Sequence, residues 1–259
     1  AVIVHDAVSE ILVLDPFIPR SQLGIIVDFA TIQHVAVRYA ADVVSAKRLA
    51  ISMLAGIPLI LIKRTKLEGW GRIMKRIFDI GVSGFFLILF APLYALIAIA
   101  IKCDSPGPVI YKNIRVGPRG LFPTYKFRRM KIELCTGPGY DATGDAERLQ
   151  QELIKTNSER RGPIFKVLND PRMTRVGRFL ERTSLDELPQ FMNVLRGNMS
   201  LVGPRPHMPQ EVAGYSKDHH QLFSVKPGIT GLAQISGRSD LDFDEEARLD
   251  IVYAENWSL

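Results

Sequence analysis

Two neighbouring carboxylates and one arginine are the residues of this chain whose types and spacing could do chemistry. Asp186 and Glu187 are adjacent, and Arg205 lies downstream between Pro204 and Pro206. A carboxylate can attack phosphorus as a nucleophile or help to hold Mg²⁺. Because proline fixes its own φ and restricts the residue before it, Arg205 has little conformational freedom. A guanidinium held in this way suits a phosphate, which it can bind through two parallel hydrogen bonds. The pattern predicts chemistry on an anionic substrate.

The same carboxylates also have a purely structural interpretation. Ser184 and Glu187 have the spacing of a capping box, in which both side chains bond free backbone donors at the start of a helix. Acidic residues in a first helical turn are also favoured by the helix dipole. Capping does not explain the constrained Arg205, so both interpretations stay open. On either one, Asp186 is expected at a helix N-terminus, where partial positive charge favours a phosphate.

Longer motifs around these residues carry a resemblance to a known family. The motifs are Thr183-Ser-Leu-Asp-Glu-Leu-Pro-Gln190, Asn193-Val-Leu, Met199-Ser-Leu-Val-Gly-Pro-Arg-Pro206 and Lys226-Pro-Gly-Ile-Thr-Gly-Leu-Ala-Gln234. From about Arg72 to the end, the chain resembles the bacterial sugar transferases, the monotopic phosphoglycosyl transferases that start glycan assembly on a polyprenyl phosphate. The resemblance implies transfer of a sugar-1-phosphate from a nucleotide-sugar, with a UDP-sugar as the expected donor, to polyprenyl phosphate.

The resemblance and the chemistry together give the carboxylates their expected roles. Asp186 is the candidate nucleophile, which would form an acyl-phosphate intermediate. Glu187 is expected to support the metal or to orient Asp186. Mg²⁺ held by one or both of these carboxylates and by the substrate phosphates would neutralise the diphosphate. We therefore expect a phosphoglycosyl transferase of the EC 2.7.8 type, with Asp186 and Glu187 as catalytic and metal-binding residues.

Basic residues are expected to bind the substrate phosphates, because phosphoryl transfer depends mainly on positioning and charge stabilisation. The stretch Tyr125-Lys-Phe-Arg-Arg-Met130 interleaves aromatic and basic residues. The family has a similar Lys-Phe-Arg motif, which implies that Lys126 and Arg128 face the active site. The same stretch could instead anchor the protein to anionic lipid headgroups. The resemblance also places Arg238 at the phosphates of the nucleotide.

One position near the carboxylates departs from the family pattern. The residue five positions before Asp186 is usually basic in the family, and here it is Glu181. Either the neighbouring Arg182 takes over the role in substrate binding, or substrate recognition differs.

The charge of the chain is unevenly distributed. The 259 residues carry a net charge of +6, but residues 63–131 alone hold 14 Lys and Arg against 3 Asp and Glu, which gives +11. A basic segment of this kind usually binds nucleic acid or anionic lipid. Because this one brackets an apolar run, we expect a membrane lipid surface as the partner and no nucleic acid.

The apolar run extends from Ile80 to Ile101, 22 residues without a charge. As one helix it would be about 33 Å long, enough to span a bilayer. Pro92 lies near its middle, and both flanks are basic, which favours having both ends in the cytoplasm. A re-entrant helical hairpin bent near Ala91-Pro92 is favoured over a simple span, and the family resemblance implies the same. The expected location is the cytoplasmic face of the bacterial inner membrane, with monotopic insertion.

The N-terminal residues 1–62 predict part of a Rossmann-like module. Ile11–Leu14 and Ile57–Ile62 suit buried strands, and Asp42–Leu54 suits an amphipathic helix. Since no G-x-G-x-x-G is present, a bound dinucleotide is not expected. Larger family members carry a comparable module before the membrane segment. The resemblance implies a role in regulation or oligomerisation, for example a homodimer formed through this module.

The expected fold is α/β throughout, in four parts. Residues 1–62 form the partial Rossmann-like module, 63–79 a basic linker and interfacial segment, 80–102 the re-entrant membrane helix, and 103–259 a helix-rich catalytic domain at the membrane surface. Cys103 and Cys135 do not have the spacing of a metal site or a disulfide framework. This agrees with a reducing, cytoplasm-facing location.

Two other functions stay open from the sequence. One is a Mg²⁺-dependent hydrolase of nucleotide-sugar diphosphates that uses the same carboxylates at a membrane surface. The other is a basic membrane adaptor without catalysis, in which Ser184 and Glu187 only cap a helix. The identity of the sugar and of the glycan pathway is not encoded in any pattern that we can read.

Overall fold

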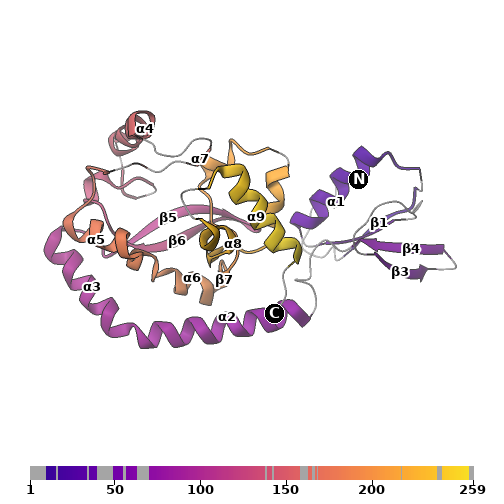
Figure 1. Ribbon diagram of the computed structural model, residues 1–259, viewed down its shortest axis with the longest axis horizontal. Coiled ribbons are helices and arrows are strands. Elements are labelled where there is room, and N and C mark those ends of the chain that lie inside the picture. The colour runs from indigo at the N-terminus through magenta and orange to yellow at the C-terminus, as the bar shows by residue number, and fades with distance from the viewer. Residues whose placement is uncertain are drawn as a thin grey trace.

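The protein combines helices with three small sheets. The computed structural model describes residues 10–15, 17–33, 35–39, 49–54, 57–62, 70–137, 139–141, 143–157, 163–164, 167, 169–216, 218–237 and 241–256. Figure 1 shows a small N-terminal module, a long bent pair of helices and a larger unit that contains the C-terminal two thirds of the chain. The mixture of helix and sheet agrees with the predicted α/β class.

The N-terminal module is a four-stranded mixed sheet with one helix. β1 (Glu10–Val13) runs parallel to β2 (Ala36–Tyr39), and α1 (Arg20–Ile32) lies between them in the chain. β3 (Leu49–Leu54) and β4 (Ile57–Ile62) form an antiparallel pair, and the strand order is β1-β2-β4-β3. The two predicted strands are confirmed as β1 and β4. The β1-α1-β2 unit is Rossmann-like, whereas β4 runs antiparallel to β2.

The helix predicted from Asp42 to Leu54 is wrong over its described part. Residues 49–54 form β3, which pairs with β4 along its whole length, from Leu49↔Ile62 to Leu54↔Ile57. Residues 42–48 lie outside the described residues. A short apolar run fits helix and strand equally well by periodicity, so the pairing partner decides.

Two consecutive helices follow, α2 (Trp70–Leu89) and α3 (Ala91–Asp104), bent by 60° at the break between them. The bend confirms the one predicted near Ala91-Pro92. Pro92 does not kink a continuous helix but lies in the first turn of α3, where its missing N–H is not needed. Within the described residues, neither helix alone is long and apolar enough to cross a membrane, but the bent pair together passes that test of length and composition.

Helix α2 begins earlier and is more unusual than the sequence suggested. The segment 63–79 was predicted as a linker, but it is helical from Trp70 on, and residues 63–69 lie outside the described part. Its buried face carries the polar residues Lys75, Asp79 and Ser83, at intervals of four. Apart from Arg72, its exposed large side chains are apolar: Trp70, Ile73, Met74, Ile77, Phe78, Ile80, Phe85, Ile88 and Leu89. A helix on the surface of a soluble domain shows the opposite pattern.

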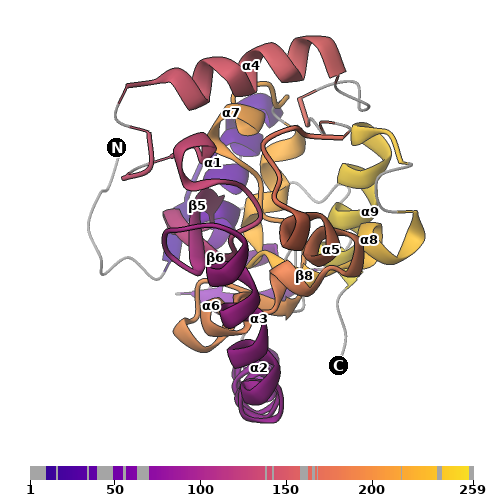
Figure 2. The same cartoon turned by 90° about the vertical axis from the view of Figure 1, so that its left-hand side faces the viewer.

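The rest of the chain forms a unit built around two small sheets. Its elements are β5 (Ile110–Gly117), β6 (Gly120–Phe127), the 3₁₀ helix η1 (Ile132–Leu134), α4 (Asp145–Asn157), α5 (Arg175–Thr183), the 3₁₀ helix η2 (Leu185–Glu187), α6 (Gln190–Arg196), β7 (Ser200–Val202), α7 (Pro209–Val212), the 3₁₀ helix η3 (Asp218–Ser224), β8 (Gly228–Thr230), α8 (Leu232–Ser236) and α9 (Phe243–Asn256). β5 and β6 form a hairpin, and β7 and β8 a parallel pair. Figure 2 shows α2 on one side of this unit and α4 on the opposite side.

Helix α3 is fixed to this unit by a hydrophobic core. Ile97 and Ile101 of α3 pack with Phe127 at the end of β6 and Leu180 of α5, and all four are buried. Burial of each such side chain stabilises the fold by about 1.5–3 kcal/mol. The core therefore joins the bent helix pair to the end of β6 and to α5.

Candidate active site

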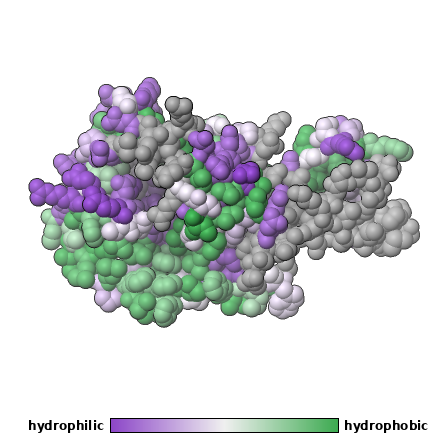
Figure 3. All heavy atoms as spheres, viewed as in Figure 1, coloured by the Kyte–Doolittle hydropathy of each residue, from purple (hydrophilic) through white to green (hydrophobic). Residues whose placement is uncertain are grey.

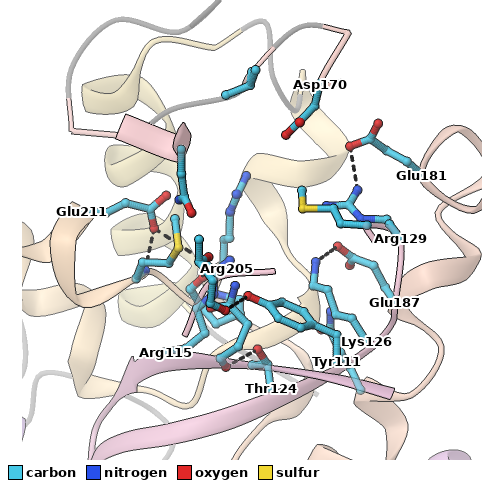
Figure 4. Close-up of a pocket in the computed structure, with 18 of the residues that line it drawn as sticks. Tyr111, Arg115, Thr124, Lys126, Arg129, Asp170, Glu181, Glu187, Arg205 and Glu211 are labelled. Atoms are coloured by element: carbon cyan, nitrogen blue, oxygen red, sulfur yellow. Dashed lines mark hydrogen bonds and ion pairs between the residues drawn. The ribbon is translucent and has the colours of Figure 1, made fainter. Parts of the chain in front are cut away.

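A strongly charged cavity of about 360 Å³ lies between the β5-β6 hairpin, α5, η2 and the loop after β7. Five basic side chains line it: Arg115, Lys126, Arg129, Arg172 and Arg205. Four carboxylates line it as well: Asp170, Glu181, Glu187 and Glu211. Figure 4 shows Lys126, Arg129 and Arg205 directed into the same space from three different segments. The structure thus brings Lys126, Glu187 and Arg205 together, as the sequence predicted.

The carboxylate pair is held in a tight turn between two helices. α5 ends at Thr183, and Ser184 adopts the left-handed conformation, with φ of 57° and ψ of 16°. The next three residues form η2, in which Asp186 is buried with 3% of its surface exposed. Non-glycine residues seldom adopt positive φ, so the surrounding structure must hold this turn in place.

This geometry excludes the capping box. η2 has no side-chain cap at Ser184, and the carboxylate of Glu187 accepts a hydrogen bond from Lys126 instead. Asp186 does lie in a first helical turn, as predicted, but the helix is the single 3₁₀ turn η2, and α6 begins only at Gln190. Ser184 ends α5, with its N–H bonded to the carbonyl of Glu181. The positive charge around the pair therefore comes from side chains.

Lys126 connects the two carboxylates. Its Nζ lies 2.7 Å from Oε1 of Glu187 and 4.0 Å from Oδ2 of Asp186. Arg129 approaches the same Oδ2 with its Nε at 3.4 Å, and its Nη1 donates to Oε1 of Glu181 at 2.6 Å. Asp186 is thus a buried carboxylate with two cations on one side.

The two carboxylates differ in their ionisation. Burial raises the pKa of Asp186 above its ordinary value, although Lys126 and Arg129 act in the opposite direction. Burial also acts to raise the pKa of Glu187, but the charge and hydrogen bond of Lys126, together with Arg205, outweigh it and leave that pKa lowered. The anionic form of Glu187 is therefore more stabilised than that of Asp186.

Arg205 is positioned by two motifs that are separate in the sequence. The Ser200–Val202 strand pairs with Gly228–Thr230, and the Gly228 N–H donates to the carbonyl of Pro204. A Cβ on Gly203 would lie 2.3 Å from the carbonyl oxygen of Lys226, so this close approach requires glycine. The backbone N–H of Arg205 itself lies 3.4 Å from Oδ2 of the buried Asp250 in α9. These contacts fix the backbone and leave the guanidinium in the cavity.

Arg128 does not face the site, contrary to the prediction. Its side chain is 1% exposed, and its guanidinium donates to the carbonyls of Ser105, Pro108 and Met130 and to the hydroxyl of Ser105. It ties the end of α3 to the end of β6. The side chain that lines the cavity is that of its neighbour Arg129, which the sequence analysis did not single out.

Asp186 is not among the described side chains that line the cavity, although it neighbours Lys126 and Arg129, which do. Arg182 is exposed on α5 and is not among the described side chains that line it. Glu181 lines the cavity and pairs with Arg129, so the acidic residue, and not its basic neighbour, contacts the site. Arg238 lies outside the described residues.

Residues 70–259 match the family model described as bacterial sugar transferase. This chain belongs to that family. It is 41% identical over 207 residues to the undecaprenyl-phosphate galactose phosphotransferase of Salmonella typhimurium. The matched region covers 78% of this chain and 41% of that protein. It is 39% identical over 217 residues to the UDP-glucose:undecaprenyl-phosphate glucose-1-phosphate transferase of Escherichia coli, covering 79% of this chain and 41% of that protein.

A shorter relative matches along most of its length. The exopolysaccharide production protein ExoY of Sinorhizobium fredii is 37% identical over 193 residues, which is 73% of this chain and 80% of that protein. The sugar transferase described here spans about two fifths of the length of the Salmonella and Escherichia relatives. All the described cavity residues lie within the part that matches the family model.

Proposed function

We propose that this sugar transferase moves a sugar-1-phosphate from a nucleotide-sugar, most simply a UDP-sugar, to a polyprenyl phosphate such as undecaprenyl phosphate. The names of the relatives contain the same acceptor and, in one case, a UDP-sugar donor. The product would be the lipid-linked first sugar of an exopolysaccharide, O-antigen, capsule or glycoprotein glycan.

The observation that carries this proposal is the environment of Asp186. A buried carboxylate with a raised pKa lies beside two cations, at 3.4 and 4.0 Å, next to a cavity rich in arginine. Desolvation weakens the stabilisation of the carboxylate and makes it a better nucleophile, while the cations can neutralise charge on a phosphate.

The reaction follows in two displacements at one phosphorus atom. An oxygen of Asp186 attacks the phosphorus that bears the sugar, and the bond to the nucleoside phosphate breaks, so that nucleoside monophosphate leaves with the electron pair. A phosphate oxygen of the acceptor then attacks the same phosphorus, which releases Asp186 and forms the polyprenyl diphosphate sugar. Lys126, Arg129 and Arg205 hold the phosphate oxygens and their developing charge.

The carboxylates also fit a bound Mg²⁺. Asp186 and Glu187 supply hard oxygen donors beside a cavity of phosphate-binding character, and Mg²⁺ commonly uses one or two carboxylates together with substrate phosphates. Among the described residues, no group of three or more His, Cys, Asp or Glu side chains could hold a metal without such help. When bound, the ion would neutralise charge on the donor diphosphate.

We further propose that α2 and α3 enter the cytoplasmic leaflet of the inner membrane and return. The exposed face of α2 is apolar, its buried face is polar, and Figure 3 shows a continuous hydrophobic surface along this side of the molecule. Exposed apolar surfaces of this extent mark contact with a membrane or partner. Engineered cysteines at both ends of the pair should react with a label from the cytoplasmic side only.

The N-terminal module is proposed to support a homodimer. Several of its large apolar side chains are exposed, notably Phe17 at 89% and Ile25 at 68%. Sedimentation of the chain with and without residues 1–62 tests this. The same number of chains per particle in both forms would contradict it.

The covalent step is tested by mass spectrometry of the intact protein incubated with nucleotide-sugar alone. The wild type should gain the mass of one sugar phosphate and release one nucleoside monophosphate. Asp186→Asn keeps the shape but removes the anionic oxygen, so it should lose the adduct and roughly 10³-fold or more of the turnover. Asp244→Asn, the same change at an exposed position of α9, is the matched control and should behave as the wild type.

Three results would contradict the proposal in different ways. No mass increase, with kinetics that need both substrates bound at once, would indicate direct transfer. Release of free sugar phosphate without an acceptor would indicate a hydrolase. Full activity of Asp186→Asn would return the carboxylates to a structural role.

A further inference from the structure

A second cavity of about 360 Å³ lies against the first one. The two share Glu187, Arg205, Ile229 and Gln234 in their walls, so they meet beside Glu187, the residue that directly follows Asp186. Their linings differ in kind. The first has five basic side chains, whereas Arg205 is the basic residue among the described lining of the second.

Leu188, Phe191 and Ala233 give the second cavity apolar lining, while its charged lining consists of Arg205 and the carboxylates of Glu187 and Glu246. Leu188 and Phe191 belong to the segment that follows Asp186 and Glu187. The cavity therefore combines one cation, which could bind a single phosphate, with apolar side chains suited to hydrocarbon.

Both apolar residues contact the bent helix pair. The ring of Phe191 stacks on Phe86 of α2 with centroids 5.5 Å apart, and Phe86 in turn stacks on Phe90 at the bend. The carbonyl of Leu188 accepts a hydrogen bond of 2.6 Å from the hydroxyl of Tyr94 in α3. Among the described residues neither cavity is lined by α2 or α3 themselves, but two residues in the wall of the second cavity contact both helices of the bent pair.

We propose that the second cavity is the acceptor site, which binds the phosphate of a polyprenyl phosphate at Arg205 and its first isoprene units along Leu188 and Phe191. This inference rests on the proposed function, because it concerns the second displacement. Donor and acceptor then reach Asp186 from opposite sides of the Glu187 and Arg205 boundary. Nucleoside monophosphate can leave through the charged cavity while the acceptor enters from the membrane side.

Thr230 offers a way to fill this cavity without disturbing the core. It lines the second cavity but not the first, and it is exposed on β8. Thr230→Trp would place an indole where the first isoprene units are proposed to lie. Ile235→Trp is the matched control, because Ile235 is 76% exposed on the adjacent α8 and lines neither cavity.

The two half-reactions are measured separately, with undecaprenyl phosphate in micelles as acceptor. Thr230→Trp should form the sugar-phosphate adduct at the wild-type rate, which also shows that it is folded. Its discharge by undecaprenyl phosphate should slow by about tenfold or more through a raised apparent KM for the acceptor. Ile235→Trp should match the wild type in both half-reactions.

Several outcomes would overturn the proposal. Normal discharge in Thr230→Trp would show that the acceptor does not use this cavity, and slow adduct formation with normal discharge would assign the cavity to the donor. Competition by phosphatidic acid as strong as that of undecaprenyl phosphate would show a site for lipid phosphates in general. If the wild type forms no adduct, the covalent step of the proposed function fails. The assignment of the second cavity is then tested by the direct binding of undecaprenyl phosphate to the protein without donor. An unchanged Kd for undecaprenyl phosphate in Thr230→Trp would overturn the assignment.

Discussion

A buried ion pair fixes helix α2 to the unit that contains the candidate site, and its removal gives a sharp test of the structure. Nζ of Lys75 lies 2.7 Å from Oδ1 of Asp79, and both residues are at most 9% exposed. The same carboxylate oxygen accepts the N–H of Leu201 at 3.2 Å, and Lys75 also donates to the hydroxyl of Ser200. The pair thus holds the start of β7, the strand that leads to Arg205.

The expected effect of each substitution follows from which buried groups lose their partners. Asp79→Leu leaves the ammonium of Lys75 without its counter-ion, which should lower the free energy of unfolding by about 3–5 kcal/mol. The double variant Lys75→Met with Asp79→Leu removes both charges. Its remaining cost is the unpaired N–H of Leu201, about 1–3 kcal/mol. The double variant should therefore be more stable than the single one, although it carries more changes.

Thermal unfolding of the detergent-solubilised protein measures these differences. At about 2–4 °C per kcal/mol for a unit of this size, Asp79→Leu should lower the Tm by roughly 6–20 °C, and the double variant should recover part of the loss. Arg72→Met, which removes an exposed charge from the same helix, should leave the Tm almost unchanged. The single variant Lys75→Met completes the comparison. If the loss of unfolding free energy in the double variant equalled the sum of the losses in Asp79→Leu and Lys75→Met, the two groups would not form a buried pair, and α2 would be held in another way.

Two further predictions concern residues behind the site. Arg128→Met should lower the Tm strongly, because it leaves several buried carbonyls without donors. Lys126→Met should keep the fold and lose activity. Equal Tm values for both variants would contradict the buried placement of Arg128. Burial raises the pKa of Asp250 to about 7, above its unfolded value, so the folded protein loses stability as the pH rises from about 4 to 7. Asp250→Asn carries no charge at this position. The Tm of this variant relative to the wild type should therefore rise between pH 4 and 7 and stay constant above pH 7. A Tm difference that does not depend on pH would refute a buried, protonated Asp250.

The elements that could be predicted from sequence are those with local signals. Thr174 begins α5 by accepting the N–H of Gly177 with its hydroxyl, and Pro92 marks the start of α3. Both signals act within a few residues, so a single sequence contains them in full. The motif around Asp186 was found for the same reason, because its residues are contiguous.

The wrong prediction for Arg128, in whose place Arg129 lines the cavity, shows where prediction from local signals fails. Alternation along a strand places Lys126 and Arg128 on one face, and this would hold if β6 continued. β6 ends at Phe127, and the next residues turn to meet a distant segment: Arg129 accepts the N–H of Thr174, and Met130 pairs with Met173. The side-chain direction therefore depends on a partner more than 40 residues away, which local periodicity does not contain.

A usable signal was present in α2. Lys75, Asp79 and Ser83 recur every four residues within a helix whose other side chains are largely apolar. Residues at this spacing share one face, so a polar stripe on an apolar helix indicates that the polar side meets protein. The apolar side is then left for another environment. The pattern would have extended the predicted helix to the N-terminal side of Ile80.

The placement of Asp186 relative to the bent helix pair follows from one short segment. Tyr94 and Phe86, on either side of the bend, contact Leu188 and Phe191, which are two and five residues beyond Asp186. Any tilt of the helix pair against the rest of the unit would therefore move η2 and change the distances from Asp186 to Lys126 and Arg129. The core of Ile97, Ile101, Phe127 and Leu180 opposes such a tilt from the other end of α3. The bent pair thus sets the position of the Asp186 carboxylate, so the proposed membrane contact and the proposed chemistry depend on the same two helices.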